Sequence, residues 1–200
     1  SKVIDLQTGK VMLSLKAGDA CAAPHDMAWS PDGNRIAVGS ALIDAHSGQT
    51  VRALQGRETG FVFPQPGWSI RFGPDGAYIA AGGQVIAPNR LLPITVWDAN
   101  TGAKVAQMGP DEAAYDPALN RTRVALALDG QSLLVLYEDG ELVRWTFGGD
   151  TPPVRTTLVR MPVVAAQPPL TWSADSRRFA VGNRYGGAAV WDVETGRQVA

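Results

Sequence analysis

The sequence is poor in the residues that build most metal and redox centres. It contains one cysteine, Cys21, and two histidines, His25 and His46, among 200 residues. A single thiol can form neither an internal disulfide framework nor a thiolate-rich metal site, and the two histidines have no metal-ligand spacing. We therefore expect no metal site, and we interpret Cys21 as a small buried or half-buried residue and both histidines as loop residues.

An excess of charge of one sign and long apolar runs are missing too. The 18 basic and 19 acidic residues give a formal net charge of −1, and the basic residues are scattered, so no patch attracts nucleic acid or anionic lipid. No run of roughly 18 apolar residues predicts a transmembrane helix. No charged leader precedes an apolar core, although a leader outside these residues would leave no trace in them. We expect a cytoplasmic protein with no nucleic-acid or membrane partner.

Catalytic motifs are absent as well. The sequence has no serine nucleophile elbow, phosphate-binding loop or dinucleotide-binding fingerprint. The segment "GWSIRFG" at 67–73 contains a serine, but that serine lies on an expected strand and not on a strand-to-helix turn. We therefore predict no catalytic residue and no cofactor.

A turn that carries an aspartate recurs between apolar segments. It is found in "MAWSPDGNRIAVGS", "IRFGPDGAYIAAGG", "VALALDGQSLLVLY" and "LTWSADSRRFAVGN". In each copy, large apolar residues stand three and five positions before the aspartate and four positions after it. Aspartate bonds to nearby backbone and glycine accepts a positive φ, so each copy predicts two strands joined by a tight turn. The aspartates, which we interpret as turn formers, are Asp32, Asp75, Asp129 and Asp175.

A second motif follows each of these copies and also opens the sequence. It reads "KVIDLQTGKVM", "ALIDAHSGQTV", "ITVWDANTGAKV", "LVRWTFGGD" and "AVWDVETGRQV". The alternation of apolar and polar residues, rich in β-branched and aromatic types, predicts strands on both sides of a turn. The residues at the aligned centre, which we interpret as core residues, are Ile4, Ile43, Trp97, Trp145 and Trp191.

Each unit thus contains four short strands, and successive units begin roughly 40 to 50 residues apart, which is the pattern of propeller blades. "MAWSPDGNRIAVGS" followed by a strand ending in "VWDxxTG" resembles the WD40 repeat, in an Ala/Gly-rich, bacterial-type form. The resemblance covers nearly the whole chain. It implies an all-β fold, a β-propeller of four-stranded antiparallel blades.

The sequence departs from the WD40 pattern at two places. The Gly-His pair that usually precedes the first strand is absent, and two units have Ile43-Asp44 and Trp145-Thr146 instead of Trp-Asp. The buried His-Ser-Asp-Trp hydrogen-bond network of many family members therefore cannot form. We expect apolar packing between the sheets to hold the blades together.

The repeat divides residues 1–200 into about four and a half blades of a single domain. We expect these blades to belong to a ring of about seven, the usual size that the resemblance implies. The alternative is a complete chain whose copies form a homo-oligomer through their open blade edges. The expected blades span 26–54, 68–108, 122–159 and 169–200, and residues 2–15 form the outer half of a further blade.

The long connections are where we expect function, because loops held by a rigid scaffold are the usual binding sites. In a propeller the connections 16–25, 55–67, 82–93, 109–121 and 160–168 emerge on one face. Their apolar and arginine side chains either pack down and close the mouth of the channel or anchor a partner. The candidate partner-binding residues are Phe61, Phe63, Trp68, Arg90, Leu92, Tyr115, Arg121, Arg184 and Tyr185.

Taken together, these observations predict a non-enzymatic scaffold or recognition module that binds a protein or peptide through its long-loop face. The prediction depends on family resemblance and on the missing catalytic residues, because a fold does not itself imply a function. The alternative is a small-ligand-binding or catalytic propeller, of the periplasmic or quinoprotein type, whose site lies largely in other blades.

Overall fold

The computed structural model describes the chain as a series of β-strands. The residues that it describes are 2–14, 27–54, 69–82, 85–87, 90–91, 94–108, 123–126, 132–136, 141–148, 151–160, 170–173, 175, 177–182 and 187–200. The regular elements within them are all strands, and every strand pairing is antiparallel.

Three complete sheets of four strands form the centre of the molecule. In each sheet the strands lie in chain order from the inner to the outer edge. The first sheet contains β3 (Met27–Trp29), β4 (Arg35–Val38), β5 (Ala41–Asp44) and β6 (Thr50–Ala53). The second contains β7 (Ser69–Phe72), β8 (Tyr78–Gly82), β11 (Ile94–Asp98) and β12 (Lys104–Met108). The third contains β13 (Arg123–Leu126), β14 (Ser132–Leu136), β15 (Glu141–Gly148) and β16 (Thr151–Arg160).

Smaller sheets lie before and after these three. The first strands, β1 (Lys2–Ile4) and β2 (Val11–Ser14), form a two-stranded sheet, and β9 (Val85–Ala87) pairs with β10 (Arg90–Leu91). The last sheet contains β17 (Leu170–Trp172), β18 (Arg178–Gly182) and β19 (Ala188–Asp192). An isolated bridge between Trp191 and Gln198 takes the place of its fourth strand.

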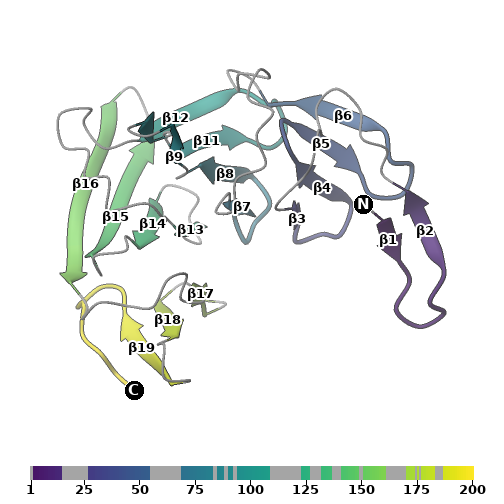
Figure 1. The fold of residues 1–200 in the computed structure, drawn as a ribbon. Helices are drawn as coiled ribbons and strands as arrows, with labels where there is room; N and C mark the ends of the chain where they lie inside the picture. The colour runs from purple at the N-terminus through teal and green to yellow at the C-terminus, as the bar shows by residue number, and fades with distance from the viewer. Residues whose placement is uncertain are drawn as a thin grey trace.

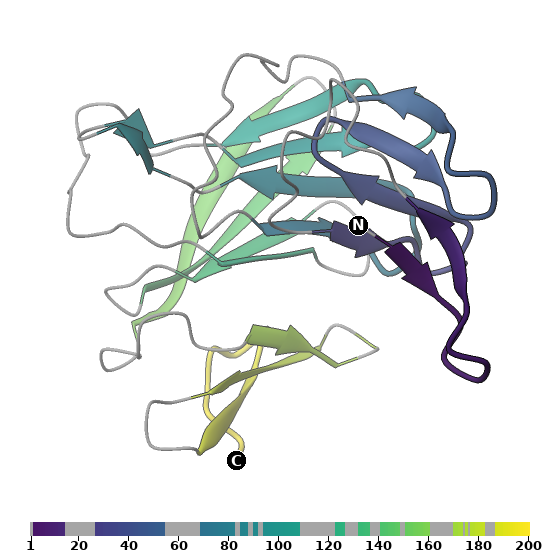
Figure 2. The same ribbon diagram turned by 45° about the vertical axis from the view of Figure 1, so that its right-hand side comes forward.

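The sheets follow one another along an arc. Figures 1 and 2 show β1–β2 at one end of this arc and the β17–β19 sheet at the other, with β3, β7 and β13 on the inside and β6, β12 and β16 on the outside. Four-stranded antiparallel sheets placed radially in chain order are propeller blades. The expected all-β propeller fold is confirmed.

Apolar side chains fill the spaces between facing sheets. Ala37 and Leu42 of the first sheet are buried against Ile79 and Trp97 of the second. The next space is filled by side chains of the second and third sheets, including Val96, Met108, Leu133 and Phe147. The last contains Leu134 and Leu142 of the third sheet with Phe179 and Val181 of the last. Since burial of apolar surface is the main favourable term in folding, this packing accounts for the cohesion of the stack, as the sequence predicted.

Two tryptophans on the third strand of their blades lie opposite apolar side chains of the second strand. Trp145 lies opposite Leu133, and Trp191 lies opposite Phe179. The Trp191 ring also stacks on Phe179, with centroids 6.4 Å apart. The indole nitrogens of both tryptophans are buried without a hydrogen-bond partner. The side chains opposite them, of Leu133 and Phe179, have no atom that could accept a hydrogen bond from the indole N–H.

The outer turn between the third and fourth strands is closed by an aspartate everywhere except in the third sheet, where Thr146 stands at this position. Oδ1 of Asp98 accepts hydrogen bonds from the Thr101 N–H at 2.8 Å and from the Thr101 hydroxyl at 3.1 Å. The Gly102 N–H donates to the Asp98 carbonyl at 2.8 Å. The same bonds recur with Asp5, Asp44 and Asp192. The turns are therefore built locally, from residues within four positions of one aspartate.

The glycine of this outer turn also lies against the preceding sheet. Gly102 has a φ of +73°, and a Cβ there would overlap the Ala53 carbonyl oxygen and the Arg52 side chain on β6. At Gly48 a Cβ would come within 2.7 Å of the Leu13 side chain on β2. Gly9 has the same conformation, with nothing within 4 Å. The β1–β2 sheet therefore stacks on the first sheet as the complete sheets stack on one another.

Candidate recognition surface

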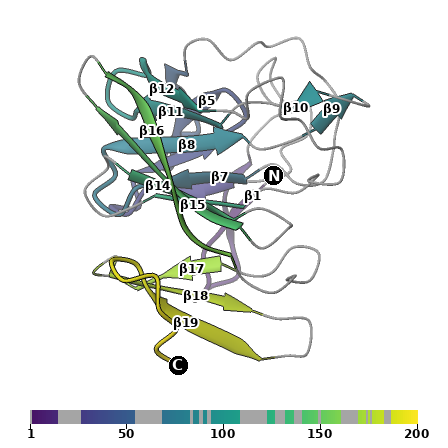
Figure 3. The same ribbon diagram turned by 90° about the vertical axis from the view of Figure 1, so that its left-hand side faces the viewer.

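The strand registers bring the ends of the long connections to one edge of each sheet. In the second sheet, Ser69 at the start of β7 pairs with Gly82 at the end of β8, and Ile94 at the start of β11 pairs with Met108 at the end of β12. Connections between blades and between second and third strands leave from this edge, and the aspartate turns lie at the opposite edge. Figure 3 shows β9 and β10 standing to one side of the stacked sheets. They belong to the connection between β8 and β11.

Of the candidate partner-binding residues, the structure places one by its backbone. Arg90 begins β10 and pairs with Ala87 of β9. Its side chain lies outside the described part of the structure. The remaining candidates also lie outside the described residues: Phe61, Phe63, Trp68, Leu92, Tyr115, Arg121, Arg184 and Tyr185.

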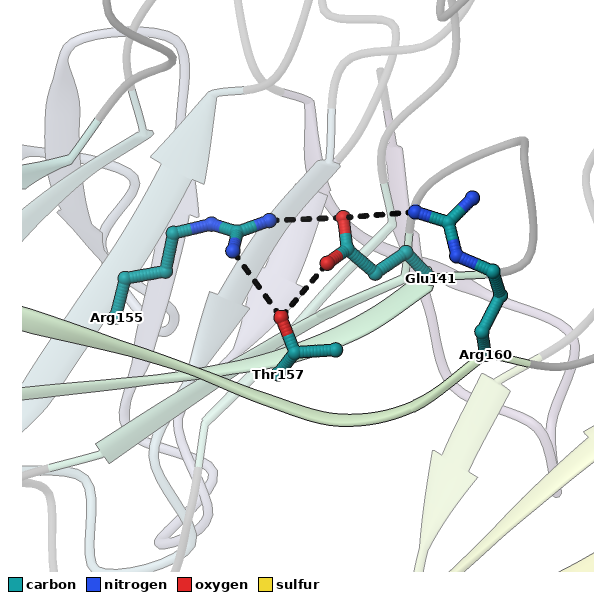
Figure 4. A network of polar contacts seen from close by, with 4 residues as sticks. All are labelled: Glu141, Arg155, Thr157 and Arg160. Atoms are coloured by element: carbon teal, nitrogen blue, oxygen red, sulfur yellow. Dashed lines mark hydrogen bonds and ion pairs between the residues drawn. The ribbon is translucent and has the colours of Figure 1, made fainter.

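A charged cluster lies at the same edge of the third sheet (Figure 4). Oε2 of Glu141 is 2.8 Å from Nη2 of Arg155 and 3.9 Å from Nη2 of Arg160. The Thr157 hydroxyl donates to Oε1 of Glu141 at 2.7 Å and accepts from Nη1 of Arg155 at 3.1 Å. The Glu141 side chain is largely covered, and both arginines are substantially exposed. The cluster thus presents two guanidinium groups whose positions are tied to one carboxylate.

The position of this cluster relates it to the long connections. Glu141 is the first residue of β15 and Arg160 is the last residue of β16, and the two are paired in register. Both therefore border the edge from which connections leave. Neither Glu141 nor the two arginines are among the binding residues predicted from the sequence. The sequence does contain a sign of this cluster, because an acidic residue at the start of one strand can pair with basic residues of the next strand.

The aspartates that recur in the turns do not gather into a site. The Ser30 hydroxyl, followed by the Asn34 N–H, lowers the pKa of Asp32 to about 2. The pKa of Asp175 is lowered in the same way, by the Ser173 hydroxyl first. The pKa values of four outer-turn aspartates are lowered mainly by a backbone N–H three residues along the chain: Asp5, Asp44, Asp98 and Asp192. Each carboxylate is stabilised in its charged form by its own turn, which is a structural role.

Among the described residues, no group of three or more His, Cys, Asp or Glu side chains could hold a metal ion. In the same part of the chain, no helix is long and apolar enough to span a bilayer.

Comparison with known proteins gives neither a family nor a function for this chain. No family model matches the sequence, and no curated protein matches it. Among solved structures, the chain is similar to "Dihydro-heme d1 dehydrogenase NirN in complex with DHE", with a TM-score of 0.49 and 22% identity. The match covers 88% of this chain and 35% of the other, so this chain spans about a third of that protein's length. The fold assignment therefore depends on the strand order and registers described above, which define an all-β protein of the β-propeller class.

Proposed function

We propose that this chain is a WD40-like propeller segment that acts as a non-enzymatic recognition module. It binds a protein or peptide on the face from which the long connections leave the sheets. The observation that carries the proposal is the register of the second sheet, where Ser69 pairs with Gly82 and Ile94 pairs with Met108. This arrangement gathers long, variable segments on one side of a stack whose opposite turns are short and hydrogen-bonded.

The rigidity of the stack supports the proposal. Buried apolar side chains join each complete sheet to the next, and Arg35 bonds the first sheet to the second. A scaffold of this kind holds loops in place without a large entropic cost on binding. The WD40-like assignment within the propeller class is supported by the repeated aspartate turn that follows the third strand.

The charge of the described edge indicates what a partner would meet. Arg155 and Arg160 flank Glu141, so the cluster carries one net positive charge and two exposed guanidinium groups. Arginine is enriched at the energetic centres of protein interfaces because its planar fork binds carboxylates and backbone carbonyls. The proposed partner therefore presents acceptor groups near this edge and apolar side chains near the predicted aromatic residues.

A peptide-selection experiment tests the proposal. A library of random peptides displayed on phage is selected against the full chain, and the strongest binder is titrated by calorimetry against Phe63→Ala and Arg90→Ala. We expect each substitution to weaken binding by at least about tenfold, as the loss of an anchor residue does. We also expect the melting temperature to change little, because both residues belong to the proposed binding face.

The matched control is Glu194→Ala, an exposed residue in the outer turn after β19. This variant should bind the peptide as the unmodified chain does. If the library yields no binder, or if binding depends on Glu194 but not on Phe63 or Arg90, the proposed face is wrong. A large drop in melting temperature for Phe63→Ala would instead show that this side chain packs down on the propeller.

A further inference from the structure

The outer strand of the third sheet, β16, differs from the outer strands of the other two complete sheets. It contains ten residues, whereas β6 contains four and β12 contains five. The pairing of β6 with β5 is irregular at Val51, and that of β12 with β11 is irregular at Val105. In β16 the four consecutive residues 154–157 pair regularly with β15. Among the complete sheets, β16 therefore has the longest regular outer edge.

The side of β16 that faces away from β15 is an open sheet edge. Within the described residues β16 pairs with β15 alone, and Figure 1 shows it on the outside of the arc of sheets. An edge strand presents unpaired N–H and C=O groups to which another strand can add. Pro152 and Pro153 have no N–H, so the donors of this edge lie within 154–160. Most residues of β16 are exposed, which leaves this part of the edge accessible.

The face of β16 that is turned toward the second sheet is basic. Trp145 on β15 packs against the cluster between the second and third sheets, and Glu141 lies on the same face of β15 because side chains alternate along a strand. Arg155 and Arg160 of β16 meet Glu141 there (Figure 4). Their side chains are 43% and 62% exposed, and β16 contains no acidic residue. Two guanidinium groups and one carboxylate leave this face with a positive charge.

This charge argues against a second copy of the chain as the occupant of the edge. Two β16 strands added edge to edge would bring four arginines together around two glutamates, and neighbouring like charges on paired strands are destabilising. The other outer strands are basic too, since β6 carries Arg52 and β12 carries Lys104. The strand that complements β16 therefore has to be acidic.

We propose that the outer edge of β16 binds an extended acidic segment of a partner protein, which adds to the third sheet as a fifth strand. This inference deepens the proposed function and rests on it for the partner being a protein or peptide. In strand addition, backbone hydrogen bonds supply affinity and alternate side chains supply specificity. The two arginines supply that specificity here.

The register of β15 and β16 predicts the spacing of the acidic residues. Arg155 is paired with Trp145, and Arg160 is paired with Glu141. Trp145 and Glu141 are four positions apart on one face of β15, although the arginines are five positions apart, because the pairing is irregular between them. A partner strand that follows β16 as β15 does therefore carries its two carboxylates four positions apart, both on the face turned toward the second sheet.

The test uses the synthetic peptide Thr-Val-Glu-Val-Thr-Val-Glu-Val-Thr, capped at both ends, whose glutamates have this spacing. The peptide is titrated into the full chain by calorimetry, and amide hydrogen exchange is measured with and without it. We expect one-to-one binding, slower exchange within 154–160, and weaker binding as the salt concentration rises. A peptide that does not bind overturns this inference. The proposed function is tested separately, by a binder that depends on Phe63 and Arg90.

Two altered peptides separate strand addition from charge attraction. The same sequence with lysine in place of glutamate should bind at least about tenfold more weakly. A peptide that is N-methylated at its backbone amides keeps both carboxylates and loses its donors, so it cannot add as a strand, and we expect no detectable binding. If either altered peptide binds as well as the original, the proposal is overturned.

Variants of the chain locate the site. Arg160→Glu should weaken binding of the acidic peptide by at least about tenfold, and Arg160→Gln, which removes the charge alone, should cause a smaller loss. Arg52→Glu is the matched control, because it makes the same change of charge at an exposed arginine of the outer strand β6, and it should bind normally. Equal losses in Arg160→Glu and Arg52→Glu, or protection on β6 instead of β16, overturn the proposal.

Two further outcomes would assign the peptide or the edge to something else. Phe63→Ala should bind the acidic peptide as the unmodified chain does, and a loss of binding in this variant would place the peptide on the face of the long connections. A dimer of the chain that protects 154–160 from exchange without peptide would make a second copy the occupant. Either result overturns the proposal.

Discussion

The Arg35 guanidinium bonds to the backbone of the neighbouring blade. Its Nη1 donates to the Ala99 carbonyl oxygen at 2.9 Å, and its Nη2 donates to the Gly76 carbonyl oxygen at 3.4 Å. Ala99 lies in the outer turn and Gly76 in the inner turn of the second blade. One side chain thus links the first sheet to both turns of the second blade.

Arg35→Met should therefore destabilise the chain. The substitution keeps much of the aliphatic stem and removes the donors to the Ala99 and Gly76 carbonyls, and we expect a loss of about 1 to 3 kcal/mol in the free energy of unfolding. Urea denaturation measures it. Arg177→Met, on an exposed arginine of the last blade, is the control and should cost about 0.5 kcal/mol or less. Equal losses in the two variants would show that the bonds between blades contribute nothing.

The outer-turn glycines allow strain and close packing to be separated. Gly9→Ala introduces a Cβ at positive φ into open space, which should cost about 1 to 2 kcal/mol. Gly102→Ala adds the same strain and an overlap with the Ala53 carbonyl and the Arg52 side chain, which should cost a further 1 to 3 kcal/mol, roughly. Thermal unfolding compares them. Similar melting temperatures would mean that the blades can move apart at no cost.

The buried indole of Trp145 has a donor without an acceptor. Trp145→Phe removes this N–H and part of the ring. The loss of packing lowers the free energy of unfolding, and the removal of a buried donor without an acceptor raises it, so the two effects partly cancel. We expect a net change of about 1 kcal/mol or less. Phe147→Ala, in the cluster that Trp145 packs against, has no such offset and should cost about 3 to 5 kcal/mol. A comparable loss in Trp145→Phe would show that its N–H is bonded in solution.

The pKa values of the turn aspartates predict how stability changes in acid. In the folded chain the pKa values of six of them lie below the ordinary value of 3.8, and that of Asp32 is lowered to about 2. The other five are Asp5, Asp44, Asp98, Asp175 and Asp192. The unfolded chain therefore binds more protons between about pH 4 and pH 2, and the free energy of unfolding falls as the pH falls through this range. Asp32→Asn should make this dependence shallower, measured as urea midpoints at several pH values. An unchanged slope would contradict the role of the Ser30 hydroxyl.

The sequence alone predicted the fold because its signal is local and repeated. Asp98 and Thr101, three residues apart, close a turn through their own backbone and side chains. The residues that form these hydrogen bonds are therefore the residues of the repeated sequence motif. The same holds for the alternation that predicts β5 and β11. The bonds between blades could not be predicted in this way, because the contact of Arg35 with Ala99 joins residues that are far apart in the sequence.

For the candidate site, the sequence determined less. It indicated which connections are long. The strand registers then showed that such connections leave the sheets at one edge, where Ser69 at the start of β7 pairs with Gly82 at the end of β8. It did not predict that Glu141 would form an ion pair with Arg155. That contact depends on which strands lie beside one another. Local chemistry therefore determined the turns, the strands and the repeat, and only the pairing and stacking of the sheets decided which side chains are buried and which remain exposed.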